Sequence, residues 1–120
     1  MHEASIAAGI LRIVQEEAQR HNAARVSCIR LQVGLLAGIE AKTLTSCFEL
    51  YAEGTPAEGA VLAIETMPMH GVCRVCGHRH EIHRRVFACP ACQSAEVDYT
   101  GGREMTIAAL EVQPHEGAHP

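Results

Sequence analysis

Four cysteines in the second half of the sequence are spaced like the ligands of one metal ion. Cys73 and Cys76 form a first Cys-x-x-Cys pair, and Cys89 and Cys92 form a second, with residues 77–88 between them. Two such turns place four soft thiolates at the corners of a tetrahedron, a geometry that suits Zn²⁺ because its filled d shell imposes no other. A site closed by sulfur on all sides leaves no position for a substrate. The spacing therefore predicts a structural zinc ion.

Other chemistries use the same four residues. Two disulfides or a redox-active pair are alternatives, although a doubled motif without a signal-peptide pattern favours zinc. Rubredoxin-type iron has the same ligands, and spacing alone does not separate it from zinc. Cys28 and Cys47 lie far from the motif. Because free cysteine is among the most buried residue types, we expect both in the core rather than on the metal.

A second candidate site is the amino-terminal sequence Met1-His2-Glu3. A free α-amino group, the imidazole of His2 and ionised backbone amides can surround one ion in a plane. Square-planar nitrogen ligation is preferred by Ni²⁺ and Cu²⁺ and is poor for Zn²⁺. By itself this signal is weak, because a histidine near a chain end is most often simply solvated.

Histidines are also frequent around the cysteines, as His70, His78, His80 and His83. The simplest interpretation is a solvated polar face. A sharper hypothesis is a pH-responsive patch, because the ordinary pKa of imidazole lies near the physiological range. The sequence assigns these side chains no definite role.

The composition disfavours nucleic-acid-binding and membrane proteins. The chain has 120 residues, 48% of them hydrophobic, and a formal net charge of −4. It lacks a basic run beyond Arg84-Arg85 and has few aromatic residues, which disfavours a nucleic-acid partner. The sequence shows neither a signal peptide nor a membrane span, so we expect a cytoplasmic protein whose thiols stay reduced.

Nothing in the sequence predicts catalysis. A Gly-rich loop ending in Lys-Ser or Lys-Thr is missing, so we expect no nucleotide hydrolysis. Glu3, Glu40 and Glu49 lie at element ends or on an exposed helix face, without an apolar pocket around them. We therefore expect a protein that is not an enzyme.

Periodicity predicts an α+β fold. Apolar residues at three- and four-residue steps predict helices over 5–19 and 40–52, whereas alternation predicts strands over 25–33 and 60–67. A continuous apolar run predicts a third strand over 104–112, central and covered on both faces. Two helices on a small three-stranded sheet follow, with a four-cysteine zinc-ribbon module inserted before the last strand.

The expected organisation has three parts. Residues 1–68 form a nickel-binding α+β domain completed by strand 102–112, residues 69–101 a zinc-binding domain, and residues 113–120 a flexible tail. Gly9 lies inside the first helix, where glycine is unfavourable, and its presence predicts a close packing contact.

In their order and separation, these motifs resemble those of the HypA/HybF family of nickel metallochaperones. The resemblance covers residues 1–112 and rests on Met1-His2-Glu3 with Ser5, the sequence Gly-Thr-Pro-Ala-Glu-Gly-Ala at 54–60, and the two cysteine pairs. It implies a fold with two metal sites: nickel bound by Met1, His2 and Glu3, and structural zinc bound by the four cysteines.

The resemblance also implies a role in [NiFe]-hydrogenase maturation. The protein is then expected to deliver Ni(II) together with a HypB-type GTPase to the precursor of the hydrogenase large subunit, and a homodimer is compatible with this role. The alternative is a zinc-ribbon regulatory or interaction protein that transports no metal. A small iron–sulfur electron carrier is a further rival.

Overall fold

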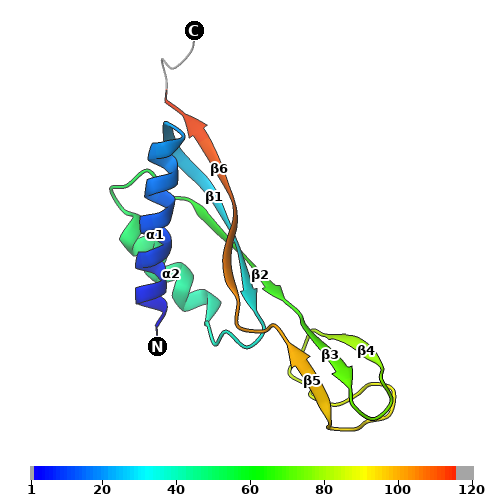
Figure 1. Cartoon of the computed structure of the whole chain (residues 1–120). Coiled ribbons are helices and arrows are strands. Elements are labelled where there is room, and N and C mark those ends of the chain that lie inside the picture. The colour runs from blue at the N-terminus through cyan, green and yellow to red at the C-terminus, as the bar shows by residue number, and fades with distance from the viewer. Residues whose placement is uncertain (1, 116–120) are drawn as a thin grey trace. The chain divides into compact units, whose positions relative to one another are not determined.

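The structure is a computed structural model that describes residues 2–115. The elements follow the order α1 (Glu3–Arg20), β1 (Ala23–Gly34), α2 (Ala41–Ala52), β2 (Val61–Met67), β3 (Met69–Cys73), β4 (Arg79–Ile82), β5 (Val97–Thr100) and β6 (Met105–Pro114). The strands form two three-stranded sheets, ordered β2-β1-β6 and β4-β3-β5 (Figure 1). Two helices, a three-stranded sheet and an inserted cysteine module confirm the predicted α+β class.

The helix α1 forms where the apolar period predicted it. Ala7, Ile10, Leu11 and Val14 are buried along one stripe. The helix ends before Asn22, which adopts a positive φ of 52°, a conformation that asparagine tolerates better than most residues. The stripe packs α1 against the rest of the core.

Gly9 does not mark a packing contact. A Cβ added at this position would meet nothing within 4 Å, so the prediction of a close approach is wrong. The glycine is half-buried, on a part of the helix surface that no neighbour approaches.

The helix α2 begins with a side-chain cap. The carboxylate of Glu40 accepts a hydrogen bond from the backbone N–H of Thr43 at 3.1 Å. Leu44, Phe48 and Ala52 are buried at three- and four-residue steps. Gly54, with φ at 77°, follows the end of the helix, where glycine is favoured because it adopts positive φ without strain.

The first sheet has β1 at its centre. Figure 1 shows both helices on one face of this sheet, where Ile29 and Leu31 of β1 join Phe48 and Leu44 of α2 among the largest fully buried side chains. β6 is an edge strand, so the prediction of a central strand covered on both faces is wrong. Its apolar run contains two alanines, Ala108 and Ala109, which stay exposed.

The alternation of β1 changes phase within the strand. The alternation over 25–33 predicts one face with Ser27, Ile29, Leu31 and Val33, but Ser27 is exposed and Val26 is buried in its place. The hydroxyl of Ser27 donates to the backbone oxygen of Glu111 in β6, at 3.1 Å. From Ile29 onward the inward positions are as predicted.

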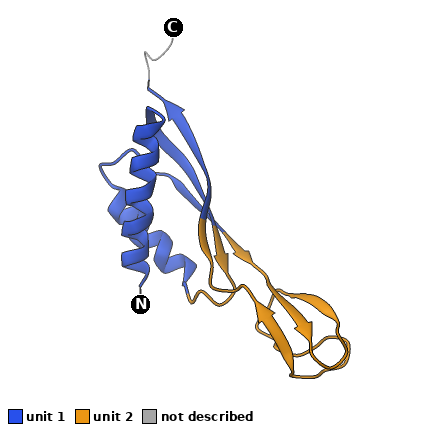
Figure 2. Cartoon of the chain, in the orientation of Figure 1, with its two compact units in different colours: residues 1–31, 39–64, 107–120 blue, residues 32–38, 65–106 orange. Residues whose placement is uncertain are grey.

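The chain forms two compact units (Figure 2). Unit 1 contains residues 1–31, 39–64 and 107–120, and unit 2 contains residues 32–38 and 65–106. The short segment 32–38 is held within unit 2 by backbone hydrogen bonds, from Gly34 N–H to Glu104 (2.8 Å) and from Leu36 N–H to Gly102 (2.6 Å). None of the described helices is both long and apolar enough to cross a bilayer.

The second sheet carries the cysteine module. β3 pairs antiparallel with β4 on one side and with β5 on the other. Gly71 lies opposite both His80 and Tyr99, so these two side chains share a face of the sheet. Cys73 ends the central strand β3, and the turn that follows it leads directly into Cys76.

Candidate metal centres

The structure brings the four predicted cysteines together. The sulfur atoms of Cys73, Cys76, Cys89 and Cys92 all lie within 4.8 Å of one another. Cys73 Sγ and Cys92 Sγ are 3.6 Å apart, as are Cys76 Sγ and Cys89 Sγ. A tetrahedral ion with metal–sulfur bonds of about 2.3 Å requires sulfur atoms about 3.8 Å apart. The cluster therefore fits a tetrathiolate ion, and these separations are too long for disulfides.

The two Cys-x-x-Cys turns repeat the same backbone pattern. In the first, Gly77 N–H donates to Cys73 O (3.0 Å), and in the second Gln93 N–H donates to Cys89 O (2.8 Å). The residue after each pair has a positive φ, 76° for Gly77 and 64° for Gln93. Each turn thus folds back on its first cysteine and presents both sulfur atoms on one side.

Backbone amides point at the first sulfur atom. The N–H groups of Val75 and Cys76 donate to Cys73 Sγ at 3.3 and 3.5 Å. The hydrogen bond from Cys76, followed by that from Val75, lowers the pKa of the Cys73 thiol to about 7 against the opposing effect of burial. A thiolate is thereby favoured at this corner, ready for a metal ion.

Two of the other corners, Cys76 and Cys92, ionise less easily without a cation. At Cys92 the Ser94 amide acts to lower the pKa, but desolvation and hydrogen bonds with the neighbouring thiols outweigh it and raise the pKa to about 12. The pKa of Cys76 is also raised, because the effects of the Cys89 thiol and burial exceed that of the His78 amide. A divalent cation removes this conflict by replacing the thiol protons.

A small apolar core supports the cluster. Cys73 and Cys89 are buried together with Val97, and Tyr99 packs against them. Phe87 meets the Tyr99 ring edge-on, with centroids 5.4 Å apart. The cysteine module therefore has little core of its own, as is usual for a module that a metal ion stabilises.

The nearby histidines do not complete a second cluster. His78 and His80 stack with ring centroids 5.6 Å apart. Among the described residues, the four cysteines are the only group of three or more His, Cys, Asp or Glu side chains placed to hold an ion. Cys28 and Cys47 are partly buried, outside the cluster.

The amino-terminal candidates lie at the start of α1. Met1 lies outside the described residues. His2 is exposed, precedes the helix, and its side chain makes no capping hydrogen bond. The first helical hydrogen bond runs from Ile6 N–H to His2 O (2.9 Å), so the amides of His2 and Glu3 are not part of the helical ladder. Neither N–H group is needed for a helical hydrogen bond.

Glu3 has a structural role that the sequence did not reveal. Its side chain is only 5% exposed, and Oε2 accepts a hydrogen bond from Glu40 N–H at 3.0 Å. This bond is the main reason that the pKa of the Glu3 carboxyl is lowered to about 2. The carboxylate thus joins the first turn of α1 to the start of α2. No local pattern could have predicted a partner so distant in sequence.

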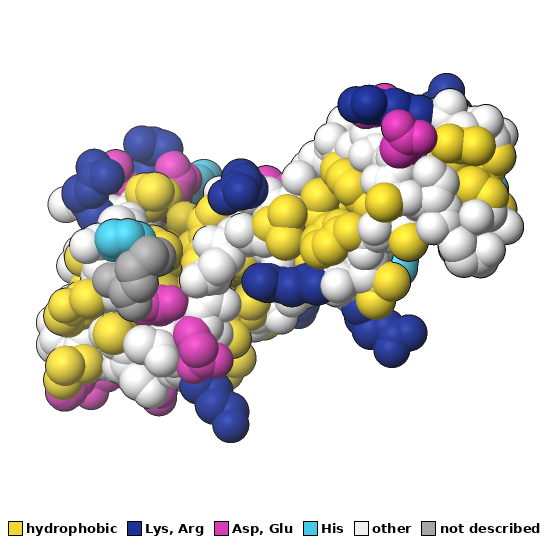
Figure 3. All heavy atoms as spheres, turned by 90° about the horizontal axis from the view of Figure 1, so that it is seen from below, with side chains coloured by type: hydrophobic (Ala, Val, Ile, Leu, Met, Phe, Trp, Pro, Cys, Tyr) yellow, Lys and Arg dark blue, Asp and Glu magenta, His cyan; other side chains and the backbone are white. Residues whose placement is uncertain are grey.

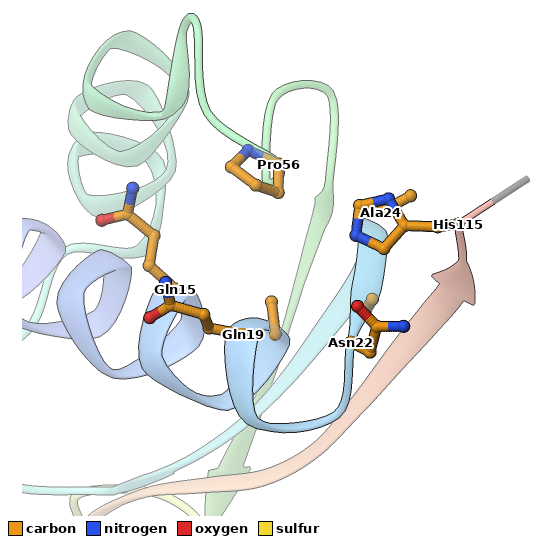
Figure 4. A pocket seen from close by; sticks show the side chains of 8 residues that line it. Gln15, Gln19, Asn22, Ala24, Pro56 and His115 are labelled. Carbon is orange, nitrogen blue, oxygen red and sulfur yellow. The ribbon is translucent and has the colours of Figure 1, made fainter. Parts of the chain in front are cut away.

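A hollow of about 380 Å³ lies elsewhere in unit 1. Figure 4 shows Gln15 and Gln19 of α1, with Asn22, Pro56 and His115, around it. Its polar groups are neutral amides and one imidazole, with no thiolate or carboxylate. This hollow is therefore not a candidate metal site.

Comparison with known proteins gives a consistent answer. A family described as HypA, hydrogenase/urease nickel incorporation, metallochaperone, matches residues 1–112. The hydrogenase maturation factor HypA of Alkalilimnicola ehrlichii is 43% identical over 112 residues, covering 93% of this chain and 99% of the relative. HypA of Azotobacter vinelandii is 41% identical over 113 residues, covering 94% of this chain and all of the relative.

A solved structure shares the fold. The solution structure of the Ni metallochaperone HypA from Helicobacter pylori superposes with a TM-score of 0.65 at 24% identity, covering 96% of this chain and 100% of that one. At this level of identity the likeness concerns the fold alone.

Proposed function

This chain belongs to the HypA family of hydrogenase and urease nickel-incorporation metallochaperones, and from that premise we propose that it carries Ni(II) to a [NiFe]-hydrogenase during maturation. The observation that supports this most directly is that His2 is exposed and its side chain makes no capping hydrogen bond, in a chain whose residues 1–112 match the family. In this proposal nickel is cargo, and zinc is a permanent part of the fold.

The cysteine cluster holds the resident ion. Cys73, Cys76, Cys89 and Cys92 would hold Zn²⁺, which supplies structural stability and no reaction chemistry. All four corners are sulfur, so no position remains for exchange with a partner. The amides aimed at Cys73 Sγ stabilise its thiolate.

The amino terminus holds the cargo. The α-amino group of Met1, the His2 imidazole and the backbone amides of His2 and Glu3 offer nitrogen ligands in one plane, which suits Ni²⁺. The Glu3 carboxylate accepts a hydrogen bond from Glu40 N–H and so holds the first turn of α1 in place. The proposed nickel ligands are therefore attached to a fixed residue. Binding releases protons, and nickel affinity therefore rises with pH. Because the same ligands bind Cu²⁺ more tightly, selectivity comes from metal availability and partner contacts.

Membership of the family supports a cellular role for the protein. We expect a cytoplasmic protein without catalytic activity that works with a HypB-type GTPase and with the precursor of the hydrogenase large subunit. A homodimer is compatible with this role. The sorting of the two ions needs no chemistry beyond ligand exchange.

Nickel titration of the zinc-loaded protein tests the proposal. His2→Gln should abolish the nickel site and leave the zinc content and the helical circular dichroism unchanged. His21→Gln is the matched control, because His21 is also exposed and follows the other end of α1. Its nickel affinity should equal that of the wild type.

Two results would favour the rivals. Nickel binding that persists in His2→Gln, or that is absent from the wild type, points to a zinc-ribbon interaction protein that transports no metal. A purified protein that absorbs strongly in the visible before any nickel is added points to a ferric tetrathiolate and an electron carrier.

A further inference from the structure

A hollow of about 320 Å³ lies on unit 2, between β4 and the segment that follows it. Ile82, Val86, Ala88 and Pro90 give it apolar walls, and Arg84 and His83 stand at its polar side. Its size is at the lower end for sites that bind organic groups. It has room for one aliphatic or aromatic side chain rather than for a large ligand.

Two large hydrophobic side chains at the hollow are exposed: Val86, which lines it, and Phe87, which follows in sequence. Val86 is 64% exposed and Phe87 is 41% exposed, although both are large hydrophobic side chains. Phe87 is held by its edge-on contact with Tyr99. In Figure 3, hydrophobic side chains (yellow) lie next to Lys or Arg side chains (dark blue) on the surface. Exposed hydrophobic residues with a charged border are typical of protein-binding surfaces.

The positive charge at the hollow is the guanidinium of Arg84, which has no ion-pair partner among the described residues. Arg84 is exposed and, within the described residues, has no carboxylate within 4 Å. The carboxylate that lines the hollow, Glu81, is engaged by His83 Nε2 at 3.0 Å. Arg85 is directed elsewhere, toward the backbone oxygen of Leu35 at 3.3 Å. One guanidinium is thus available to an outside anion.

That anion is better supplied by a carboxylate than by a nucleic-acid backbone. Unit 2 has arginines at 74, 79, 84, 85 and 103, and these are matched by acidic residues at 65, 81, 96, 98 and 104. Binding to a phosphate backbone requires a continuous basic face. Arg84 is the arginine that lines the apolar hollow, and its guanidinium fits one carboxylate next to one apolar side chain.

We infer that the hollow of β4 and residues 83–90, with Val86 and Phe87, docks a partner protein through a segment that carries Asp or Glu beside an aliphatic or aromatic residue. The carboxylate pairs with Arg84, and the apolar side chain enters the hollow. This interaction is separate from the nickel site and needs no nickel.

The test uses the full-length zinc-loaded protein as bait for a library of random displayed peptides. Enriched peptides should place Asp or Glu next to an apolar residue. The most enriched peptide, labelled with fluorescein, is then titrated by anisotropy. Arg84→Glu should weaken its binding by about tenfold or more, because a paired charge becomes a repulsive one. Val86→Ser should weaken it by a smaller factor.

Controls separate this surface from general effects. Arg12→Glu also reverses an exposed arginine, on α1, and should leave peptide binding unchanged. Because Arg84 and Val86 are exposed, their variants should keep the wild-type zinc content and nickel affinity. His2→Gln should bind the peptide as well as the wild type, so failure of the nickel proposal is distinguishable from failure of this one.

Three results would overturn the inference. The first is enrichment of peptides without acidic residues, and the second is full binding by Arg84→Glu. The third is selective binding of labelled single-stranded polyuridylate RNA that is lost in Arg84→Glu, which would assign the surface to nucleic acid.

Discussion

Glu3 illustrates how one side chain can serve both fold and site. Its buried carboxylate receives the N–H of Glu40 and joins the beginnings of the two helices, one residue away from the proposed nickel ligand His2. The carboxylate is favoured in the folded state because its pKa is lowered from 4.5 to about 2. Folding therefore gains stability from the ionised form.

Acid should remove this contribution. With the folded pKa below the unfolded one, the stabilisation by Glu3 is complete above about pH 4.5 and is lost as the pH falls toward 2. Glu3→Gln should therefore be less stable than the wild type at neutral pH, and the two should converge in acid. Denaturant unfolding followed by helical circular dichroism at several pH values measures the difference.

Glu16→Gln is the control, since Glu16 is exposed on the same helix and pairs only loosely with Arg12, at 3.9 Å. Its stability should follow that of the wild type at every pH. A Glu3→Gln deficit that is absent, or that stays constant down to pH 2, would contradict the assignment.

The two cysteine turns share one backbone conformation but carry different residues at its last position. Gly77 and Gln93 occupy equivalent places with positive φ, where a residue with a Cβ is strained. Gly77→Gln should weaken zinc retention by about 1 kcal/mol, or roughly fivefold, because metal binding and folding are coupled here. Gln93→Gly should strengthen it by a similar or smaller amount. Competition with a zinc chelator measures both, and effects of the same sign would refute the argument.

At the scale of elements, the end of β1 lies against the backbone of the chain that precedes β6. A Cβ on Gly34 would lie 2.3 Å from the backbone of Gly102 and 2.2 Å from Glu104 Oε1. Gly34→Ala should therefore destabilise the protein by about 1–3 kcal/mol through overpacking. Gly9→Ala, in the open part of α1, should stabilise it by about 1 kcal/mol.

Thermal unfolding of the two variants compares the same chemical change at two sites. The melting temperature should fall for Gly34→Ala and rise for Gly9→Ala. If both variants shift in the same direction, packing at Gly34 is not what requires glycine there.

Most elements could be predicted from signals within a few residues. Features that depend on contacts between distant segments could not. Both helices followed from apolar period and caps, because such signals are contained within a few residues. The place of β6 at the sheet edge depends on which strands pair. Its apolar stretch, which includes Ala108 and Ala109, has the sequence pattern of a buried strand although both alanines are exposed. The phase change in β1 at Ser27 depends on a partner in β6, which the sequence of β1 does not contain.

At the scale of the whole molecule, the proposed function requires two ligand sets for two ions. The sulfur cluster could be predicted from the spacing of Cys73, Cys76, Cys89 and Cys92, because each turn is local. The link from Glu3 to Glu40 and the hollow beside Arg84 could not, since each needs the folded chain. The nickel site rests on His2 and on the family to which the chain belongs.

X-ray absorption at both metal edges, on protein loaded with zinc and then with one equivalent of nickel, tests this division most directly. We expect a zinc edge with sulfur scatterers only, from the four cysteines. The nickel edge should show nitrogen and oxygen scatterers only. Sulfur bound directly to nickel, or nitrogen bound directly to zinc, would contradict this division.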